Sequence, residues 1–168
     1  MLKVIFLDFD GVLNSGDNST ALHYLMCNNP DINRTFIAGV EFDERCVRWL
    51  RYIINCTDAK IVISSSWKFL YKLEELQSIW NELSLPGEII GYTPCIDCEF
   101  ISTFEEDIKP VERGKEIQRW LDLNKVEKYC IIDDDYYEML PDQVFVQTDP
   151  EFGLTHETAK LVVEYLTV

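Results

Sequence analysis

Residues 3–14 of the chain read KVIFLDFDGVLN. The stretch begins with a short, mostly apolar run, and such a run is typical of a β-strand buried inside a sheet. Two aspartates and a glycine come directly after the run, so acidic side chains stand where the strand ends. The stretch therefore predicts a buried strand over residues 3–7 that is followed by an acidic loop.

Strand and helix patterns alternate along the rest of the chain. Short runs rich in β-branched and aromatic residues predict further strands over residues 60–63, 88–91, 129–132 and 144–147. Apolar residues at helical spacing predict helices over residues 43–55, 67–83, 112–123 and 155–166. Short strands separated by helices favour an α/β fold, a Rossmann-like three-layer sandwich whose five-stranded, mainly parallel sheet has helices on both faces.

The chain has 168 residues, which lies in the size range of one domain, and no repeat or low-complexity linker divides it. We therefore expect a single domain over residues 1–168. Two stretches without clear periodicity, residues 14–40 and 92–110, are long for connections. They are candidates for small cap or loop insertions.

The composition limits the classes of partner. Thirty acidic against fifteen basic residues give a net charge of −15, and a field of this sign disfavours general binding to nucleic acids. Screening confines that field to about 8 Å at physiological salt, so a local basic patch can still hold a phosphate. Six of the fifteen basic residues gather in one part of the sequence: Lys109, Arg113, Lys115, Arg119, Lys125 and Lys128.

The sequence also favours a cytoplasmic protein without a membrane partner. No apolar run approaches the roughly 20 residues of a membrane-spanning helix, and the apolar run at residues 2–7 is too short for a secretory signal. The six cysteines are scattered, and we expect them to be reduced thiols. Cys95 and Cys98 form a lone C-x-x-C pair in a chain with two histidines, which argues against a zinc site.

Polar side chains follow three of the predicted strands. Residues 8–10 read DFD after the first strand, residues 64–66 read SSS after the second, and residues 133–135 read DDD after the fourth. Because ligands bind beyond the carboxyl ends of parallel strands, we expect these side chains to meet at that edge. Two carboxylates about 4 Å apart repel by about 4 kcal/mol at an effective dielectric of about 20, and Mg²⁺ relieves such repulsion.

The order of these segments resembles the four motifs of the haloacid dehalogenase (HAD) superfamily of phosphohydrolases, whose first motif is an apolar strand followed by Asp-x-Asp-Gly. By this resemblance Asp8 is the nucleophile that forms an aspartyl phosphate. Asp10 is then the acid that protonates the leaving oxygen and afterwards activates water. Gly11 allows a sharp turn that brings backbone amides toward the phosphate. The alternative interpretation of the two aspartates is a solvated acidic turn.

The second motif of the superfamily is a serine or threonine that hydrogen-bonds the transferring phosphoryl group at the end of the second strand. Ser64 is the first candidate for this role and for substrate binding, and Ser65 is the second. A serine at this place can instead cap the helix that follows, and different serines can do both.

The third motif is a basic residue near the start of the helix that precedes the fourth strand. Arg113 and Lys115 are the candidates for this catalytic cation. They are separated by about 200° around a helix, so only one of them can face the site, and the spacing leaves open which one. In the alternative interpretation both are exposed helix charges. Residues 113–117 lack the Lys-Pro pairing that is common in this motif.

The fourth motif is an apolar strand followed by two acids, and residues 130–134 match it. By resemblance one of Asp133 and Asp134 binds Mg²⁺ directly, while the other acts through water or orients the basic residue. We favour Asp134 as the direct ligand, together with Asp8 and the backbone carbonyl of Asp10.

The four motifs together imply a Mg²⁺-dependent phosphomonoester hydrolase that acts through an aspartyl phosphate on Asp8. The substrate is then a nucleotide, a polynucleotide end or a small-molecule phosphate. Residues 63–67, 113–121 and 149–155 also resemble a small branch of the superfamily that occurs in RNA-repair proteins, which favours a phosphorylated RNA or DNA end.

Two other classes of function compete with this interpretation. One is a catalytically idle domain of the same fold that serves as a binding or regulatory module. The other is a receiver domain, which needs a phosphate-accepting carboxylate after the third strand, where residues 91–93 read GYT. The oligomeric state stays open.

Overall fold

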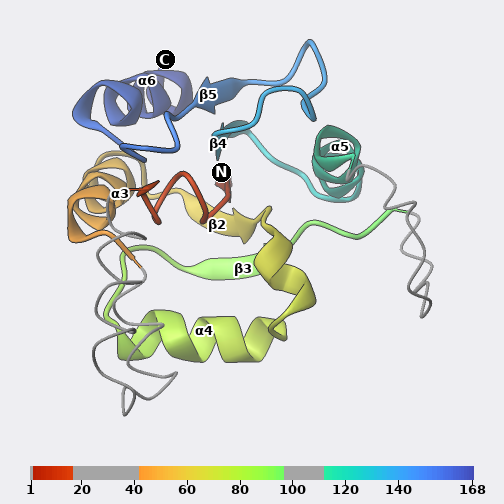
Figure 1. Cartoon of the computed structure of the whole chain (residues 1–168). Coiled ribbons are helices and arrows are strands. Elements are labelled where there is room, and N and C mark those ends of the chain that lie inside the picture. Colours follow the sequence, from red (N-terminus) through yellow and green to blue (C-terminus); the bar gives the residue numbers. More distant parts are fainter. Residues whose placement is uncertain (1, 17–41, 97–111) are drawn as a thin grey trace.

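The computed structural model describes residues 2–16, 42–96 and 112–168 (Figure 1). The strands in these ranges are β1 (Lys3–Leu7), β2 (Lys60–Ile63), β3 (Ile89–Tyr92), β4 (Lys128–Asp133) and β5 (Phe145–Gln147). The helices are α3 (Glu44–Thr57), the short 3-10 helix η1 (Ser66–Phe69), α4 (Leu73–Glu82), α5 (Arg113–Leu123) and α6 (His156–Thr167). Most of the two candidate insertions lies outside the described residues, so the domain division stays a prediction.

The strands form one sheet in the order β3-β2-β1-β4-β5, and all pairings between them are parallel. The apolar strand β1 lies in the middle of the sheet, and its residues from Val4 to Leu7 are fully buried. The five-stranded sheet predicted from the sequence is therefore confirmed, and within the described strands it is entirely parallel.

Alternate residues of β1 point into two separate cores. Ile5 and Leu7 belong to the larger core, which contains apolar residues of α3, α4 and α6. Val4 and Phe6 belong to the smaller core, which α5 covers through Ile117. Figure 1 likewise shows α3 and α6 on one side of the sheet and α5 on the other. The three-layer, Rossmann-like α/β sandwich is confirmed.

The single helix predicted over residues 67–83 is wrong. The structure has two helical segments there, because η1 ends at Phe69 and α4 begins at Leu73. Lys72 stands between them with an extended backbone (φ −71°, ψ 158°), and its backbone N–H donates to the Glu75 carboxylate at 2.7 Å. This contact begins a new helix, and apolar spacing carries no signal for it.

The other predicted helices and strands are present, and their ends differ from the predicted ones by at most two residues. The side chain of Asp43 caps the amino end of α3, and that of Thr155 caps α6. Within the described part of the chain, none of the helices combines the length and the apolar character needed to cross a membrane.

The cysteines differ from the expectation at one position. Cys46, Cys56 and Cys130 are free thiols, but Cys95 is disulfide-bonded. The prediction that all the cysteines are reduced is therefore wrong for Cys95.

Candidate active site at the carboxyl edge of the sheet

The register of the sheet brings three sequence motifs to one level. Leu7 at the end of β1 pairs with Ile63 of β2 on one side and with Ile132 of β4 on the other. The next residue along each strand therefore stands at the same edge. Two backbone hydrogen bonds continue the ladder one step further, because Ser64 N donates to Leu7 O at 2.9 Å and Asp8 N to Ile132 O at 3.1 Å.

Three carboxylates meet at this edge. Asp8, Asp133 and Asp134 each offer an oxygen, and these oxygens lie within 4.8 Å of one another. Gly11 makes room for the third acid, because a Cβ atom at Gly11 would stand 2.5 Å from the carboxyl carbon of Asp134. The backbone of Gly11 also has a φ of +72°, which favours glycine over other residues.

Arg113 bridges two of these acids. Its Nη1 lies 2.5 Å from Asp8 Oδ2 and 2.5 Å from Asp133 Oδ2, and its side chain is 14% exposed. Gly114 anchors the start of α5 near the site, since its N–H donates to the backbone carbonyl of Glu138 at 2.9 Å. Arg113 is therefore not an exposed helix charge.

Lys115, the other candidate for the catalytic cation, lies away from the acids. Its ammonium pairs with Glu112 at 2.5 Å and its side chain is 55% exposed. The two candidates do fall on different sides of α5, as helical geometry requires. The structure thus brings Arg113 to the acids and leaves Lys115 on the surface.

Burial shapes the titration of these groups. Burial, and then the neighbouring Asp8 carboxylate, raise the pKa of Asp133 to about 7. Burial also raises the pKa of Asp134 above its ordinary value. Burial acts to lower the pKa of the Arg113 guanidinium, but the carboxylates of Asp8 and Asp133 outweigh burial and raise it. These groups form one strongly interacting set.

The donor set fits a divalent cation. One guanidinium faces three carboxylates, so negative charge remains after Arg113 is counted. All three offered ligand atoms are carboxylate oxygens, which Mg²⁺ prefers over nitrogen and sulfur. The acidic group is therefore compatible with a bound metal ion.

Asp10 lies beside the cluster and has its own partners. Its side chain is exposed, and its two oxygens accept hydrogen bonds from Asn14 Nδ2 at 3.1 Å and from Trp67 Nε1 at 3.0 Å. The carboxylate of Asp10 does not belong to the group of three acids. The metal contact expected from Asp10 uses its backbone carbonyl and does not need the side chain.

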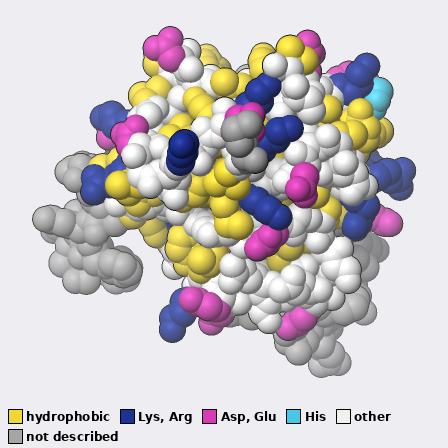
Figure 2. Space-filling view, turned by 180° about the vertical axis from the view of Figure 1, so that it is seen from behind, with side chains coloured by type: hydrophobic (Ala, Val, Ile, Leu, Met, Phe, Trp, Pro, Cys, Tyr) yellow, Lys and Arg dark blue, Asp and Glu magenta, His cyan; other side chains and the backbone are white. Residues whose placement is uncertain are grey.

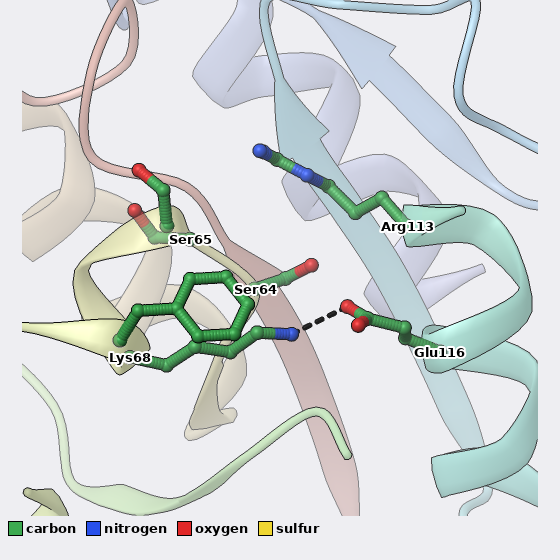
Figure 3. Close-up of a pocket in the computed structure, with 7 residues that line it drawn as sticks. Ser64, Ser65, Lys68, Arg113 and Glu116 are labelled. Atoms are coloured by element: carbon green, nitrogen blue, oxygen red, sulfur yellow. Dashed lines mark hydrogen bonds and ion pairs between the residues drawn. The ribbon is translucent and has the colours of Figure 1, made fainter. Parts of the chain in front are cut away.

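Ser64 and Ser65, which follow β2, differ in their hydrogen bonding. Ser65 caps η1, because its Oγ accepts from the backbone N–H of Trp67 at 3.4 Å. Ser64 is 1% exposed, and its Oγ has no hydrogen-bond partner among the described residues. Figure 3 shows the Ser64 hydroxyl directed toward α5, while Ser65 turns to the other side. Ser64 therefore offers an unused polar group to the pocket in front of Arg113.

Several residues at the site carry no recognisable signal in the sequence. Lys68 and Glu116 form a buried ion pair at the pocket, with nitrogen and oxygen 2.5 Å apart. Thr148 Oγ1 donates to the carbonyl of Gly11 at 2.8 Å and so ties the end of β5 to the acidic loop. Together with Trp67 they hold the site by long-range contacts, which no local pattern encodes.

A comparison with protein families agrees with this geometry. The model of the HAD domain in Swiss Army Knife RNA repair proteins matches residues 4–159, which include all the side chains described at the site. None of the curated proteins and none of the solved structures compared with the chain matches it. The family match supports a phosphohydrolase of the HAD type in general. On this evidence the chain belongs to the family of HAD domains found in Swiss Army Knife RNA repair proteins.

Proposed function

We propose that this protein is a Mg²⁺-dependent phosphomonoester hydrolase that acts through an aspartyl phosphate on Asp8. The observation that supports this most directly is the surroundings of Asp8. Its carboxylate lies in one cluster with the carboxylates of Asp133 and Asp134 and the Arg113 guanidinium. The Ser64 hydroxyl, which has no hydrogen-bond partner among the described residues, stands at the same level of the sheet. A nucleophile, a metal site and donors for a phosphoryl group then lie together.

The metal ligands in this proposal are the carboxylates of Asp8 and Asp134 and the backbone carbonyl of Asp10. Asp133 keeps its contact with Arg113 and orients that side chain. A bound Mg²⁺ would neutralise charge on the nucleophile and on the phosphoryl oxygens.

The reaction has two steps. In the first, an oxygen of Asp8 forms a bond to phosphorus while the bond to the leaving oxygen breaks, and Asp10 gives its proton to that oxygen. In the second, Asp10 takes a proton from water as the water oxygen attacks phosphorus, which releases phosphate and restores Asp8. Ser64 donates a hydrogen bond to a phosphoryl oxygen, and Arg113 compensates the charge near the nucleophile.

For the substrate we favour a phosphorylated nucleotide or RNA or DNA end over a small-molecule phosphate. The family match to RNA repair proteins supports this choice. The net charge of −15 opposes wide contact with a polynucleotide. On the face that Figure 2 shows, basic side chains are interspersed with acidic ones and form no continuous basic surface. Recognition of a terminal phosphate with few backbone contacts fits this charge distribution.

Phosphate release by the purified full chain tests the proposal. With an aryl phosphate we expect turnover with Mg²⁺ and none with EDTA, and Asp8→Asn should lower turnover by at least about a thousandfold because the nucleophile is lost. Asp122→Asn is the matched control, because Asp122 is an exposed acid on α5 that contacts Gln118. Full activity in Asp8→Asn would refute the assigned nucleophile.

Two further measurements separate the alternatives. A screen over sugar phosphates, nucleoside monophosphates and 3′- or 5′-phosphorylated oligonucleotides ranks the substrate classes by kcat/KM. An idle binding module would bind Mg²⁺ and phosphate without releasing phosphate from any of them.

A further inference from the structure

Lys68 is a buried cation that the proposed reaction leaves without a task. It lies on η1, and its side chain is 6% exposed. Its ammonium is 2.5 Å from Glu116 Oε2 and 3.1 Å from Thr93 Oγ1. Lys68, Thr93 and Glu116 come from three separate parts of the chain, so the ammonium is held in place by tertiary contacts.

The ammonium faces the same pocket as Ser64 and Arg113. Ser64, Lys68, Arg113 and Glu116 all line this pocket, and Figure 3 shows Lys68 and Ser64 both reaching toward α5. The free space is about 20 Å³. That space suits a water or an oxygen of a phosphoryl group and excludes a sugar or a base. The rest of a substrate would therefore lie outside the pocket.

Two hydrogen-bond donors in this pocket have no acceptor within residues 2–16, 42–96 and 112–168. A lysine ammonium has three N–H donors, and among the described residues two oxygen acceptors face it, on Glu116 and Thr93. Ser64 Oγ is buried and has no partner there. A pocket with one spare N–H and one spare hydroxyl matches an anionic oxygen.

Burying the Lys68–Glu116 ion pair costs free energy. Lys68 and Glu116 are only 6% and 3% exposed, and removing two charges from water costs several kcal/mol per ion before their attraction is counted. Burial lowers the pKa of Lys68 and the Glu116 carboxylate opposes that shift. An apolar pair of the same size would often be equally stable. The pair thus keeps a cation in a site where an apolar side chain could otherwise pack.

We propose that Lys68 is a second phosphate-binding cation of the site, whose spare N–H binds a non-bridging oxygen of the substrate phosphoryl group together with the Ser64 hydroxyl. The inference rests on the proposed function for the identity of the substrate. Arg113 is occupied by Asp8 and Asp133, so Lys68 supplies the positive charge on the other side of the phosphoryl group. Glu116 and Thr93 hold the ammonium at that position.

Phosphate affinity is the direct test, because it does not require turnover. Titration of the full chain with inorganic phosphate in the presence of Mg²⁺ should show about ten- to a hundredfold weaker binding in Lys68→Met, since a charge-assisted hydrogen bond is lost. Lys68→Arg should keep part of the affinity. Lys60→Met is the matched control, because Lys60 also pairs with a glutamate, Glu88, at the opposite end of β2. Equal affinity in Lys68→Met and the wild type would overturn the inference.

If Lys68→Met does not fold, the neutral double variant Lys68→Gln with Glu116→Gln takes its place in the same phosphate titration. It leaves no buried charge unpaired and should still bind phosphate at least about tenfold more weakly than the wild type. Wild-type affinity in this variant overturns the inference as well, and so does a wild-type protein that binds no phosphate.

Kinetics separate this inference from the proposed function. With an aryl phosphate, loss of a contact present in both substrate complex and transition state should raise KM more than it lowers kcat. An active wild type with unchanged KM in Lys68→Met would refute the inference and leave the hydrolase intact. An inactive wild type whose phosphate affinity falls on Lys68→Met would refute the hydrolase and support the phosphate-binding cation.

Discussion

Single residues around the acidic loop are under close geometric constraints. Gly11 combines a φ of +72° with a close approach to the Asp134 carboxylate. Trp67 and Asn14 hold the two oxygens of Asp10 from different sides. Each arrangement can be tested by comparing a variant with a matched control, which separates an effect on the site from a general loss of stability.

Gly11→Ala should weaken Mg²⁺ binding and turnover together. The new Cβ would stand 2.5 Å from the Asp134 carboxyl carbon, so that carboxylate has to move. The left-handed backbone adds a cost of about 1–2 kcal/mol in stability. Gly91→Ala is the control, since a Cβ there would lie 3.9 Å from Trp120 Nε1, an ordinary van der Waals distance. Mg²⁺ titration and phosphate release check the expectation, and equal results for the two variants would contradict it.

Trp67→Phe should reduce kcat by about tenfold, because Asp10 loses a hydrogen bond worth about 1 kcal/mol and with it a defined orientation. The phenyl ring keeps most of the packing against Phe9, whose ring centroid lies 5.1 Å away. Steady-state kinetics give the measurement. Trp80→Phe is the control, because Trp80 Nε1 donates to Pro86 O, a carbonyl outside the acidic loop. A similar fall in kcat for both variants would argue against a role for the Asp10 contact.

At the scale of elements, the start of α3 depends on one carboxylate. Asp43 caps the helix through the backbone N–H of Arg45 at 2.8 Å, and it also accepts from Ser15 Oγ at 2.8 Å and from the Arg45 guanidinium. Burial opposes ionisation, but these donors outweigh it and lower the pKa of Asp43. The ionised carboxylate therefore stabilises the fold.

Asp43→Ala should lower the free energy of unfolding at pH 7 by about 0.5–2 kcal/mol, the usual range for a lost N-cap. Because the folded pKa lies below the ordinary value of 3.8, the contribution is present above that value and is lost as the pH falls through the folded pKa. Urea unfolding at neutral and at acidic pH checks both points. Asp43→Asn keeps a hydrogen-bond acceptor and should lose less stability than Asp43→Ala. The assignment would be contradicted if the difference in unfolding free energy between the wild type and Asp43→Ala stayed the same in acid.

At the scale of the whole molecule, charge and metal binding are linked. The chain carries a net charge of −15, and three of its carboxylates share one edge of the sheet with a single guanidinium. A cation that binds the folded state and not the unfolded chain stabilises the fold by mass action. Self-repulsion of the acidic surface is a separate effect that any salt screens.

Mg²⁺ should therefore raise the melting temperature by several degrees beyond the effect of Na⁺ at matched ionic strength. In Asp134→Asn this specific part of the rise should be largely lost, because one of the acids no longer carries a charge. Thermal unfolding of both proteins in each salt is the measurement. An equal rise in Mg²⁺ and Na⁺ would show that screening alone acts.

The sequence by itself determined the strands, their acidic or serine-bearing ends and the family to which the chain belongs. Apolar runs such as residues 3–7 have to be buried on both faces, and burial leaves a signal in local composition. Asp8, Ser64 and Asp133 could be placed at one edge for the same reason, since each follows directly after such a run. The order of the motifs along the chain also indicates a HAD-type site.

Only the tertiary structure decided which polar side chains reach the site. Arg113 faces the acids and Lys115 does not, because the start of α5 is anchored on the loop after β4 through Gly114. The break before α4 and the burial of Lys68 against Glu116 likewise depend on partners that stand apart from the local apolar pattern. Burial of an apolar run is a local property of composition, whereas the direction of a charged side chain follows from contacts between distant parts of the chain.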